Sequence, residues 1–190
     1  MIKYPTILAE LADHNSHKID ADEGDITEIG NLRLTWKARG AKTGFQFSVY
    51  EMELTPGSGI PLHKHPFAEF FYVLEGTISY GRVNQQGALE WLPCNVGECI
   101  LVPANAPHAT QNQSKQPAKM LSVSNFHHEF ILTNGGNFVQ KDDALPARPN
   151  PEDLKRFTDV ARQYQGYNVE LGSDNGEGQL FSRIVSAQSR

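Results

Sequence analysis

The sequence is poor in cysteine and has no long apolar run. Of its 190 residues only Cys94 and Cys99 are cysteine, too few for the disulfide framework of a small secreted domain. Their offset matches no zinc pattern such as C-x-x-C, so we interpret both as structural thiols. No apolar stretch approaches the roughly 18 residues that a membrane-spanning helix needs. We therefore expect no membrane partner.

Positive charge is scarce as well. The 17 Lys and Arg residues stand against 22 Asp and Glu residues, which gives a formal net charge of −5. No basic run could neutralise a phosphate backbone, so we expect no nucleic-acid partner. Glu10 interrupts the short apolar patch near the N-terminus, which therefore lacks the apolar core of a secretory signal. The expected compartment is the cytoplasm.

The chain length suits one domain with extensions. We expect an N-terminal arm over residues 1–40, with a short helix at 6–12, and a β-barrel core over 41–130. From Gly44 onward, short runs rich in Phe, Val, Ile and Tyr are separated by Gly, Pro or Asn, without intervening helical patterns. This succession predicts antiparallel strands that form a sandwich or barrel.

The remaining region, 131–190, is expected to hold a Pro-rich linker, one helix and a tail that pack on the barrel or on a partner subunit. Asn150 is a good N-cap, Pro151 suits the first helical position, and Gly166 can end the helix. Two weaker strand candidates follow at 167–171 and 179–185. The helix carries one apolar stripe, formed by Leu154, Phe157, Ala161 and Tyr164.

Three histidines and one glutamate have the spacing of a metal site. Because residues two apart on a strand face the same side, His63 and His65 can present both imidazoles to one point. Glu69 can open the next strand with its carboxylate aimed at that point, and His108 begins a later strand as a fourth ligand. Imidazoles with a carboxylate suit divalent Fe, Mn, Ni, Cu or Zn.

These residues resemble the two motifs of the cupin superfamily. The first motif, G-x5-H-x-H-x3-E-x6-G, is matched by Gly57, His63, His65, Glu69 and Gly76. The second, G-x5-P-x-G-x2-H-x3-N, is matched by Gly97, Pro103, His108 and Asn112. Asn105 stands where the family has Gly. Because Asn tolerates a positive φ better than most residues, we expect the turn to survive.

The resemblance implies an all-β fold, the cupin double-stranded β-helix or jelly-roll barrel, with the arm and the C-terminal helix added to it. It implies a metal in the barrel mouth with His63, His65, Glu69 and His108 as ligands, and a homodimer. The Pro-rich linker, the P-x-D-L-x-R helix and the "YQGY" segment also resemble the tail of single-domain cupins similar to quercetin 2,3-dioxygenase.

Four protein ligands leave one or two positions on such an ion for water, dioxygen or substrate. Glu69 then has a plausible catalytic role as general base. Our first hypothesis is a dioxygenase-like oxidoreductase that acts with O2 on a small aromatic or enol-type substrate. The alternatives are a non-catalytic cupin that binds a small molecule, and a metal-dependent isomerase or decarboxylase that does not use O2.

Strand parity suggests an apolar pocket next to the metal, which favours such a substrate over a phosphorylated sugar. The expected lining is Phe71 and Val73 on the face of Glu69, with Phe47, or Tyr50 and Met52, from an earlier strand.

The other histidines are expected to lie outside the metal site. If the last motif strand continued through His127, His128 and Glu129, these side chains would alternate between faces and could not converge on one ion. We predict a cluster at the surface or just outside the site. His14 and His17 are expected to be exposed in the arm.

Overall fold

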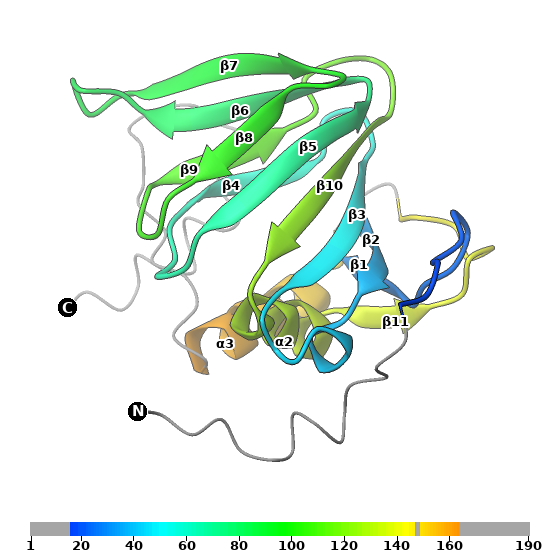
Figure 1. The fold of residues 1–190 in the computed structure, drawn as a ribbon. Helices are drawn as coiled ribbons and strands as arrows, with labels where there is room; N and C mark the ends of the chain where they lie inside the picture. The colour runs from blue at the N-terminus through cyan, green and yellow to red at the C-terminus, as the bar shows by residue number, and fades with distance from the viewer. Residues whose placement is uncertain (1–15, 147–148, 164–190) are drawn as a thin grey trace, which may run out of the picture.

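Two antiparallel sheets pack face to face into a barrel, and two helices lie together at one end of it (Figure 1). The computed structural model describes residues 16–146 and 149–163. The seven-stranded sheet has the order β11-β1-β2-β3-β10-β5-β8, with β1 Ile26–Ile29, β2 Leu32–Ala38, β3 Ser48–Leu54, β5 Glu69–Glu75, β8 Cys99–Val102, β10 Ala118–Ser124 and β11 Asn137–Val139. The four-stranded sheet has the order β4-β9-β6-β7, with β4 Gly59–His63, β6 Thr77–Val83, β7 Leu89–Asn95 and β9 His108–Gln111. A short 3-10 helix, η1 Gly40–Lys42, and two α-helices, α2 Phe126–Gly135 and α3 Pro151–Gln163, complete the described elements.

This architecture confirms the predicted all-β barrel with a C-terminal helix. Strand β3 shows how the core forms, because its even-numbered residues are all buried and its odd-numbered residues are not. Tyr50 and Met52 therefore point into the barrel, where they meet Phe71 and Val73 of β5. Phe47 precedes β3 and is 45% exposed, so the alternative that placed it in the pocket is wrong. No helix within the described ranges is long and apolar enough to span a membrane.

The stretch that we expected to be an arm contains β1 and β2 of the larger sheet. Leu32, Leu34 and Trp36 are buried at every second position of β2, which pairs with β3. This period-2 pattern is a strand signal that we overlooked, because charged residues stand between the apolar ones. The register against β3 shifts by one residue after Trp36, which marks a β-bulge at Lys37. The helix expected at 6–12 lies outside the described residues.

Helix α3 begins at Pro151 as predicted, and it packs against α2, which the sequence reasoning did not anticipate. Leu154 and Ala161 are buried in this contact region. A Cβ atom on Gly135 of α2 would lie 2.6 Å from Cδ2 of Phe157, so a glycine at this position allows the helices to approach closely. Tyr164, Gly166 and the strand candidates at 167–171 and 179–185 lie outside the described residues.

Candidate metal centre

The barrel mouth brings together the four residues that the sequence analysis singled out. His63 ends β4 and pairs directly with His108, the first residue of β9, with their ring centroids 4.1 Å apart. Glu69 is the first residue of β5 and therefore comes from the opposite sheet. The cluster thus joins the two sheets where strands of both begin or end.

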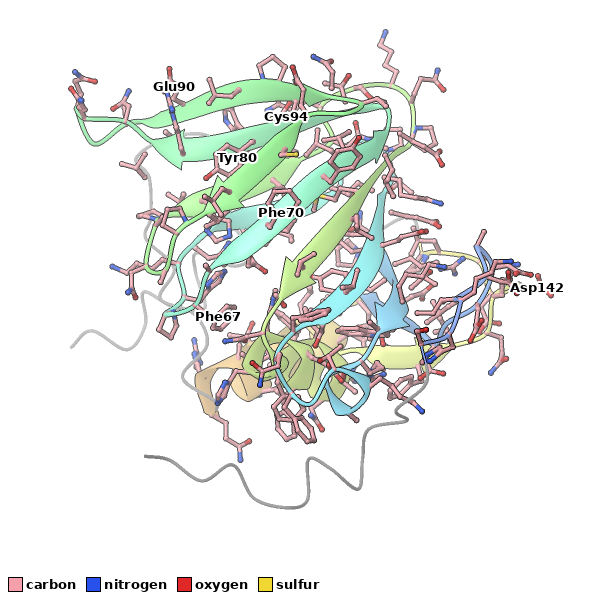
Figure 2. The ribbon with its side chains drawn as sticks, viewed as in Figure 1. Phe67, Phe70, Tyr80, Glu90, Cys94 and Asp142 are labelled. Atoms are coloured by element: carbon pink, nitrogen blue, oxygen red, sulfur yellow. The ribbon has the colours of Figure 1, made fainter. Side chains whose placement is uncertain are left out.

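His65 reaches the cluster from the connection between β4 and β5, although the H-x-H argument had placed it within a strand. Its carbonyl oxygen accepts a hydrogen bond from the backbone N–H of Asn105 at 2.7 Å. Its ring stacks on Phe67, with the centroids 4.1 Å apart and the planes 11° from parallel. Phe67 lies at the lower end of this connection in Figure 2. Contacts with neighbouring loops, rather than the strand period, therefore orient this imidazole.

One nitrogen or oxygen atom from each of the four residues lies within 4.8 Å of all the others. Ligands on opposite sides of a transition-metal ion stand about 4 Å apart at the usual ligand distances of about 2.0–2.2 Å. Small side-chain shifts would therefore let the cluster hold one ion. All four residues are nearly buried, with the following exposed fractions: His63 6%, His65 2%, Glu69 3% and His108 1%.

The backbone sets the tautomer of all three imidazoles. Each Nδ1 atom lies within hydrogen-bond distance of a carbonyl oxygen two residues away, and a carbonyl can only accept. Nδ1 must therefore carry the proton, which leaves Nε2 with a lone pair for an ion. The bonds run from His63 to Pro61 at 2.8 Å, from His65 to Phe67 at 2.8 Å and from His108 to Ala106 at 3.0 Å.

A proton count now points to a cation among these atoms. Nε2 of His65 lies 2.9 Å from Oε2 of Glu69, and Nε2 of His108 lies 3.2 Å from the same oxygen. A neutral imidazole has one N–H, which Nδ1 already uses, and the pKa of Glu69 is held well below its usual range, so its carboxylate has no proton to donate. Both contacts therefore require either two buried imidazolium ions or a cation between the atoms. Burial disfavours the first arrangement. A metal ion would bind the lone pairs of the Nε2 atoms and of Oε2 without any extra proton.

The electrostatics of the cluster fit this arrangement. Burial lowers the pKa of His63 well below its ordinary value, and the neighbouring His108 adds to the effect. Burial alone would raise the pKa of Glu69, but the electrostatic attraction of His128 and the close ring nitrogens of His108, His128 and His65 outweigh it. The pKa of Glu69 is therefore held well below its usual range. The cluster thus combines an ionised carboxylate with a neutral imidazole, as metal ligation requires.

His128 contacts Glu69, a contact that sequence reasoning did not predict. His127 to Glu129 were expected at the surface or just outside the site, which agrees with the positions of His127 and His128, but the strand assumed for them is wrong because they open helix α2. His127 is exposed, whereas His128 is buried with its Nδ1 atom 2.7 Å from Oε1 of Glu69. The available signal was Asn125, an N-cap residue whose Oδ1 accepts a hydrogen bond from the backbone N–H of His128 at 3.0 Å.

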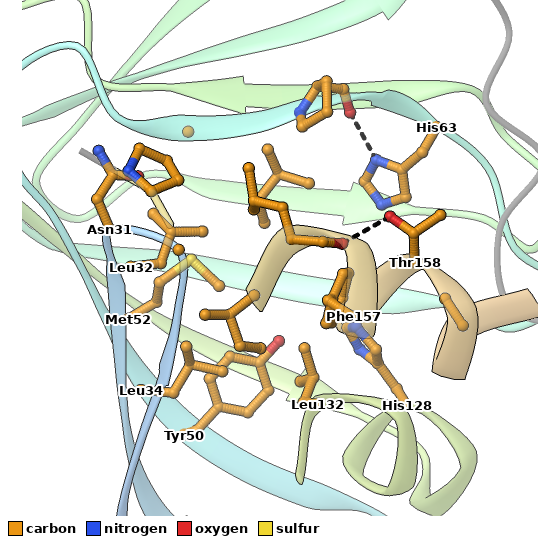
Figure 3. Close-up of a pocket in the computed structure, with 18 of the residues that line it drawn as sticks. Asn31, Leu32, Leu34, Tyr50, Met52, His63, His128, Leu132, Phe157 and Thr158 are labelled. Atoms are coloured by element: carbon orange, nitrogen blue, oxygen red, sulfur yellow. Dashed lines mark hydrogen bonds between the residues drawn. The ribbon is translucent and has the colours of Figure 1, made fainter. Parts of the chain in front are cut away.

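A largely apolar cavity of about 110 Å³ opens onto Glu69, His63 and His128 (Figure 3). One wall comes from the sheet strands and the other from α2 and α3. An engineered cavity of about 150 Å³ can hold benzene, so this space suits a small ring or a comparable fragment. The apolar lining includes Leu34, Tyr50, Met52, Phe71, Leu154 and Phe157.

The remaining candidate residues lie away from this site. Cys94 is buried and Cys99 is exposed, both are free thiols, and neither belongs to the His and Glu cluster. His17 is exposed, in agreement with the sequence expectation, and His14 lies outside the described residues.

Asn105 occupies the left-handed turn next to His65, with φ of 64°. Asn105→Gly should therefore leave the free energy of unfolding nearly unchanged, because Gly adopts this conformation without strain. Asn105→Val should lower it by about 1–2 kcal/mol, since a β-branched residue disfavours positive φ. Urea unfolding of the metal-free proteins measures both effects. Equal stability of the Gly and Val variants would show that the turn does not need this conformation.

Comparisons with known proteins agree with the fold. A family model described as "Cupin domain" matches residues 50–124. The polyketide cyclase RemF from Streptomyces resistomycificus shares the fold at 18% identity and a TM-score of 0.51, over 77% of this chain and 99% of that chain. A predicted oxalate decarboxylase from Thermotoga maritima shares it at 19% identity and a TM-score of 0.50, over 57% of this chain and 98% of that chain.

Among curated proteins, germin-like protein subfamily 2 member 2 from Arabidopsis thaliana is 34% identical over 100 residues. The match covers 52% of this chain and 46% of the relative, so the chain spans about half the length of the curated relatives it matches. The comparisons support the cupin superfamily without selecting a quercetin dioxygenase-like reaction. All four residues of the His and Glu cluster lie within residues 50–124, the range that matches the cupin domain model.

Proposed function

We propose that this protein is a metal-dependent cupin enzyme that binds one divalent transition-metal ion through His63, His65, Glu69 and His108. The proton count carries the proposal. Three imidazoles present unprotonated Nε2 atoms, and two of these atoms face a carboxylate oxygen that can only accept. Three nitrogen donors and one oxygen donor suit Fe, Mn, Ni, Cu or Zn.

The bound ion would supply Lewis acidity and open coordination positions for O2 or substrate. The protein's own residues prepare the site for this chemistry. The backbone carbonyls hold the three imidazoles in one tautomer, and the largely apolar cavity lies beside the cluster. We further propose that Oε1 of Glu69, which faces away from the other ligands, accepts a proton from the substrate.

The reaction that we propose is dioxygenase-like, with O2 acting on a small aromatic or enol-type substrate. The cavity supports this substrate class because aliphatic and aromatic side chains dominate its lining. A phosphorylated sugar would instead need several cationic side chains around the ion. The cavity also adjoins the cluster, so a substrate held in it would lie next to the ion.

Metal analysis of the purified protein, followed by O2 uptake with a panel of flavonols and diketones, tests the proposal. We expect about one transition-metal ion per chain and O2 consumption that depends on the ion. Turnover without O2 would favour an isomerase or decarboxylase, and ligand binding without turnover would favour a non-catalytic cupin. A protein that takes up no transition metal, even after reconstitution, would contradict all three metal-centred hypotheses.

Filling the cavity should weaken substrate binding and leave the metal in place. Ala161 of α3 is buried and lines the cavity, so Ala161→Phe should raise the KM of an active diketone or flavonol at least tenfold. Metal content should not change, because Ala161 does not belong to the cluster. The control is Asp159→Ala, an exposed change on the same helix. An unchanged KM in the Ala161 variant would place the substrate elsewhere.

A further inference from the structure

We infer that His128 is a positioning residue of the metal centre: its Nδ1–H group holds Oε1 of Glu69, so Glu69 offers the ion only Oε2. The inference rests on the proposed metal site and adds a residue that lies outside both sequence motifs and outside the matched range 50–124. It gives helix α2 a role in positioning a ligand of the ion, although the sequence motifs do not include this helix.

The two carboxylate oxygens of Glu69 face different partners. Oε2 lies 2.9 Å and 3.2 Å from the Nε2 atoms of His65 and His108. Oε1 lies 2.7 Å from Nδ1 of His128, on the side of α2, in an ion-pair contact whose angle is not that of a hydrogen bond; a small rotation of the imidazole would align it. A carboxylate that bound the ion with both oxygens would have to rotate Oε1 away from His128. The observed contact therefore favours ligation through one oxygen and keeps Oε1 beside the cavity.

The fold holds His128 in this place. Asn125 caps the first turn of α2, and Glu129 ties the same turn to the larger sheet. Glu129 accepts hydrogen bonds from the backbone N–H of Gly40 at 2.6 Å, from Nε of Arg39 at 2.8 Å and from the hydroxyl of Ser48. The His128 side chain, held between these anchors, has little freedom to swing away from Glu69.

Aromatic neighbours restrict the imidazole ring of His128 further. The ring packs edge-on against Tyr50, with the centroids 6.3 Å apart, and lies 5.2 Å from the ring of Phe67. The residue is 5% exposed. Ser124 places its hydroxyl 3.1 Å from the same Nδ1 atom that faces Glu69. The polar edge of the ring is thus turned toward the carboxylate, and its faces are covered.

The proposed role depends on one donor atom, which allows matched substitutions. Because a carboxylate can only accept, Nδ1 of His128 must carry the proton in this contact. The side-chain nitrogen of Asn can occupy nearly the same position as Nδ1 and donates in the same way. Leu has a similar volume without a donor, and Gln carries its nitrogen one bond farther out. His128→Asn should therefore preserve the function that His128→Leu and His128→Gln remove.

The test uses the full chain with zinc and copper as probes. Competition with a chromogenic chelator measures zinc affinity, and electron paramagnetic resonance of the Cu²⁺-loaded proteins reports the ligand arrangement. We expect the Leu and Gln variants to lose about 10- to 100-fold in zinc affinity and to show altered copper spectra. The Asn variant should keep both properties close to wild type. The control is His127→Leu, which changes an exposed residue of the same helix.

Several outcomes would overturn the inference. Wild-type zinc affinity and an unchanged copper spectrum in a folded Leu or Gln variant would show that Glu69 does not need His128. An equal loss in the Asn variant would show that the Nδ1 donor is not the cause. Failure of the wild-type protein itself to bind zinc or copper would overturn the proposed function and this inference together, which distinguishes that case from the first two.

Discussion

His108→Ala is expected to weaken zinc binding by at least about 100-fold while the barrel stays folded. Loss of a residue that only supports a ligand costs about 10- to 100-fold, so loss of a ligand itself should cost at least as much. His108 supplies one of the Nε2 atoms that face Glu69 and is paired with His63 across β4 and β9. Chelator competition measures the affinity, and circular dichroism checks the fold.

The matched control for this variant is His127→Ala, because His127 is exposed while His108 is 1% exposed. We expect the control to bind zinc as the wild-type protein does. If His108→Ala kept wild-type affinity and stoichiometry, the ion would have to bind outside the His and Glu cluster, and the proposed function would lose its site.

Glu129→Ala is expected to lower the free energy of unfolding by about 3 kcal/mol, in the range for breaking one side of a buried ion pair. The Glu129 side chain is 6% exposed and accepts hydrogen bonds from the backbone N–H of Gly40, from the hydroxyl of Ser48 and from Nε of Arg39. Arg39 can turn to water, since its side chain is 27% exposed. The buried N–H of Gly40 and the buried hydroxyl of Ser48 cannot turn to water, and an unsatisfied buried donor costs about 1–3 kcal/mol.

Urea unfolding of the metal-free protein measures this loss, and Glu90→Ala provides the control. Glu90 forms a comparable ion pair with Arg82 at 2.9 Å, but on the exposed β6/β7 hairpin (Figure 2). Removing an exposed pair should change the free energy of unfolding by less than about 1 kcal/mol. Similar effects of the two substitutions would contradict the view that Glu129 anchors α2. Because α2 carries His128, we also expect the Glu129 variant to bind zinc more weakly.

Several features of the fold followed from the sequence because neighbouring residues determine them. The alternation of apolar and polar residues gave Tyr50 and Met52 as one of two alternatives for the inward face, and the structure selects it. The N-cap Asn150 and the following Pro151 predicted the start of α3. The positive φ of Asn105 was expected from its place in a motif that otherwise has Gly. Each of these features depends on a few adjacent residues, and their physical preferences act locally.

The sequence was less informative where distant elements meet. The pattern Leu32, Leu34, Trp36 contained a strand signal, but only the pairing of β2 with β3 shows that this segment belongs to the larger sheet. The H-x-H spacing suggested two imidazoles on one strand face. His65 instead lies beyond β4 and is oriented by Asn105 and Phe67, through contacts that no periodicity encodes.

The sequence by itself determined the four candidate ligands, because strand ends and tight turns place His63, Glu69 and His108 through local geometry. Only the tertiary structure decided which other groups surround them. The contact between His128 and Glu69 requires α2 to fold against the larger sheet, and the cavity requires α3 to pack against α2. These arrangements depend on burial and packing between segments far apart in the chain. Local sequence preferences carry little information about such contacts.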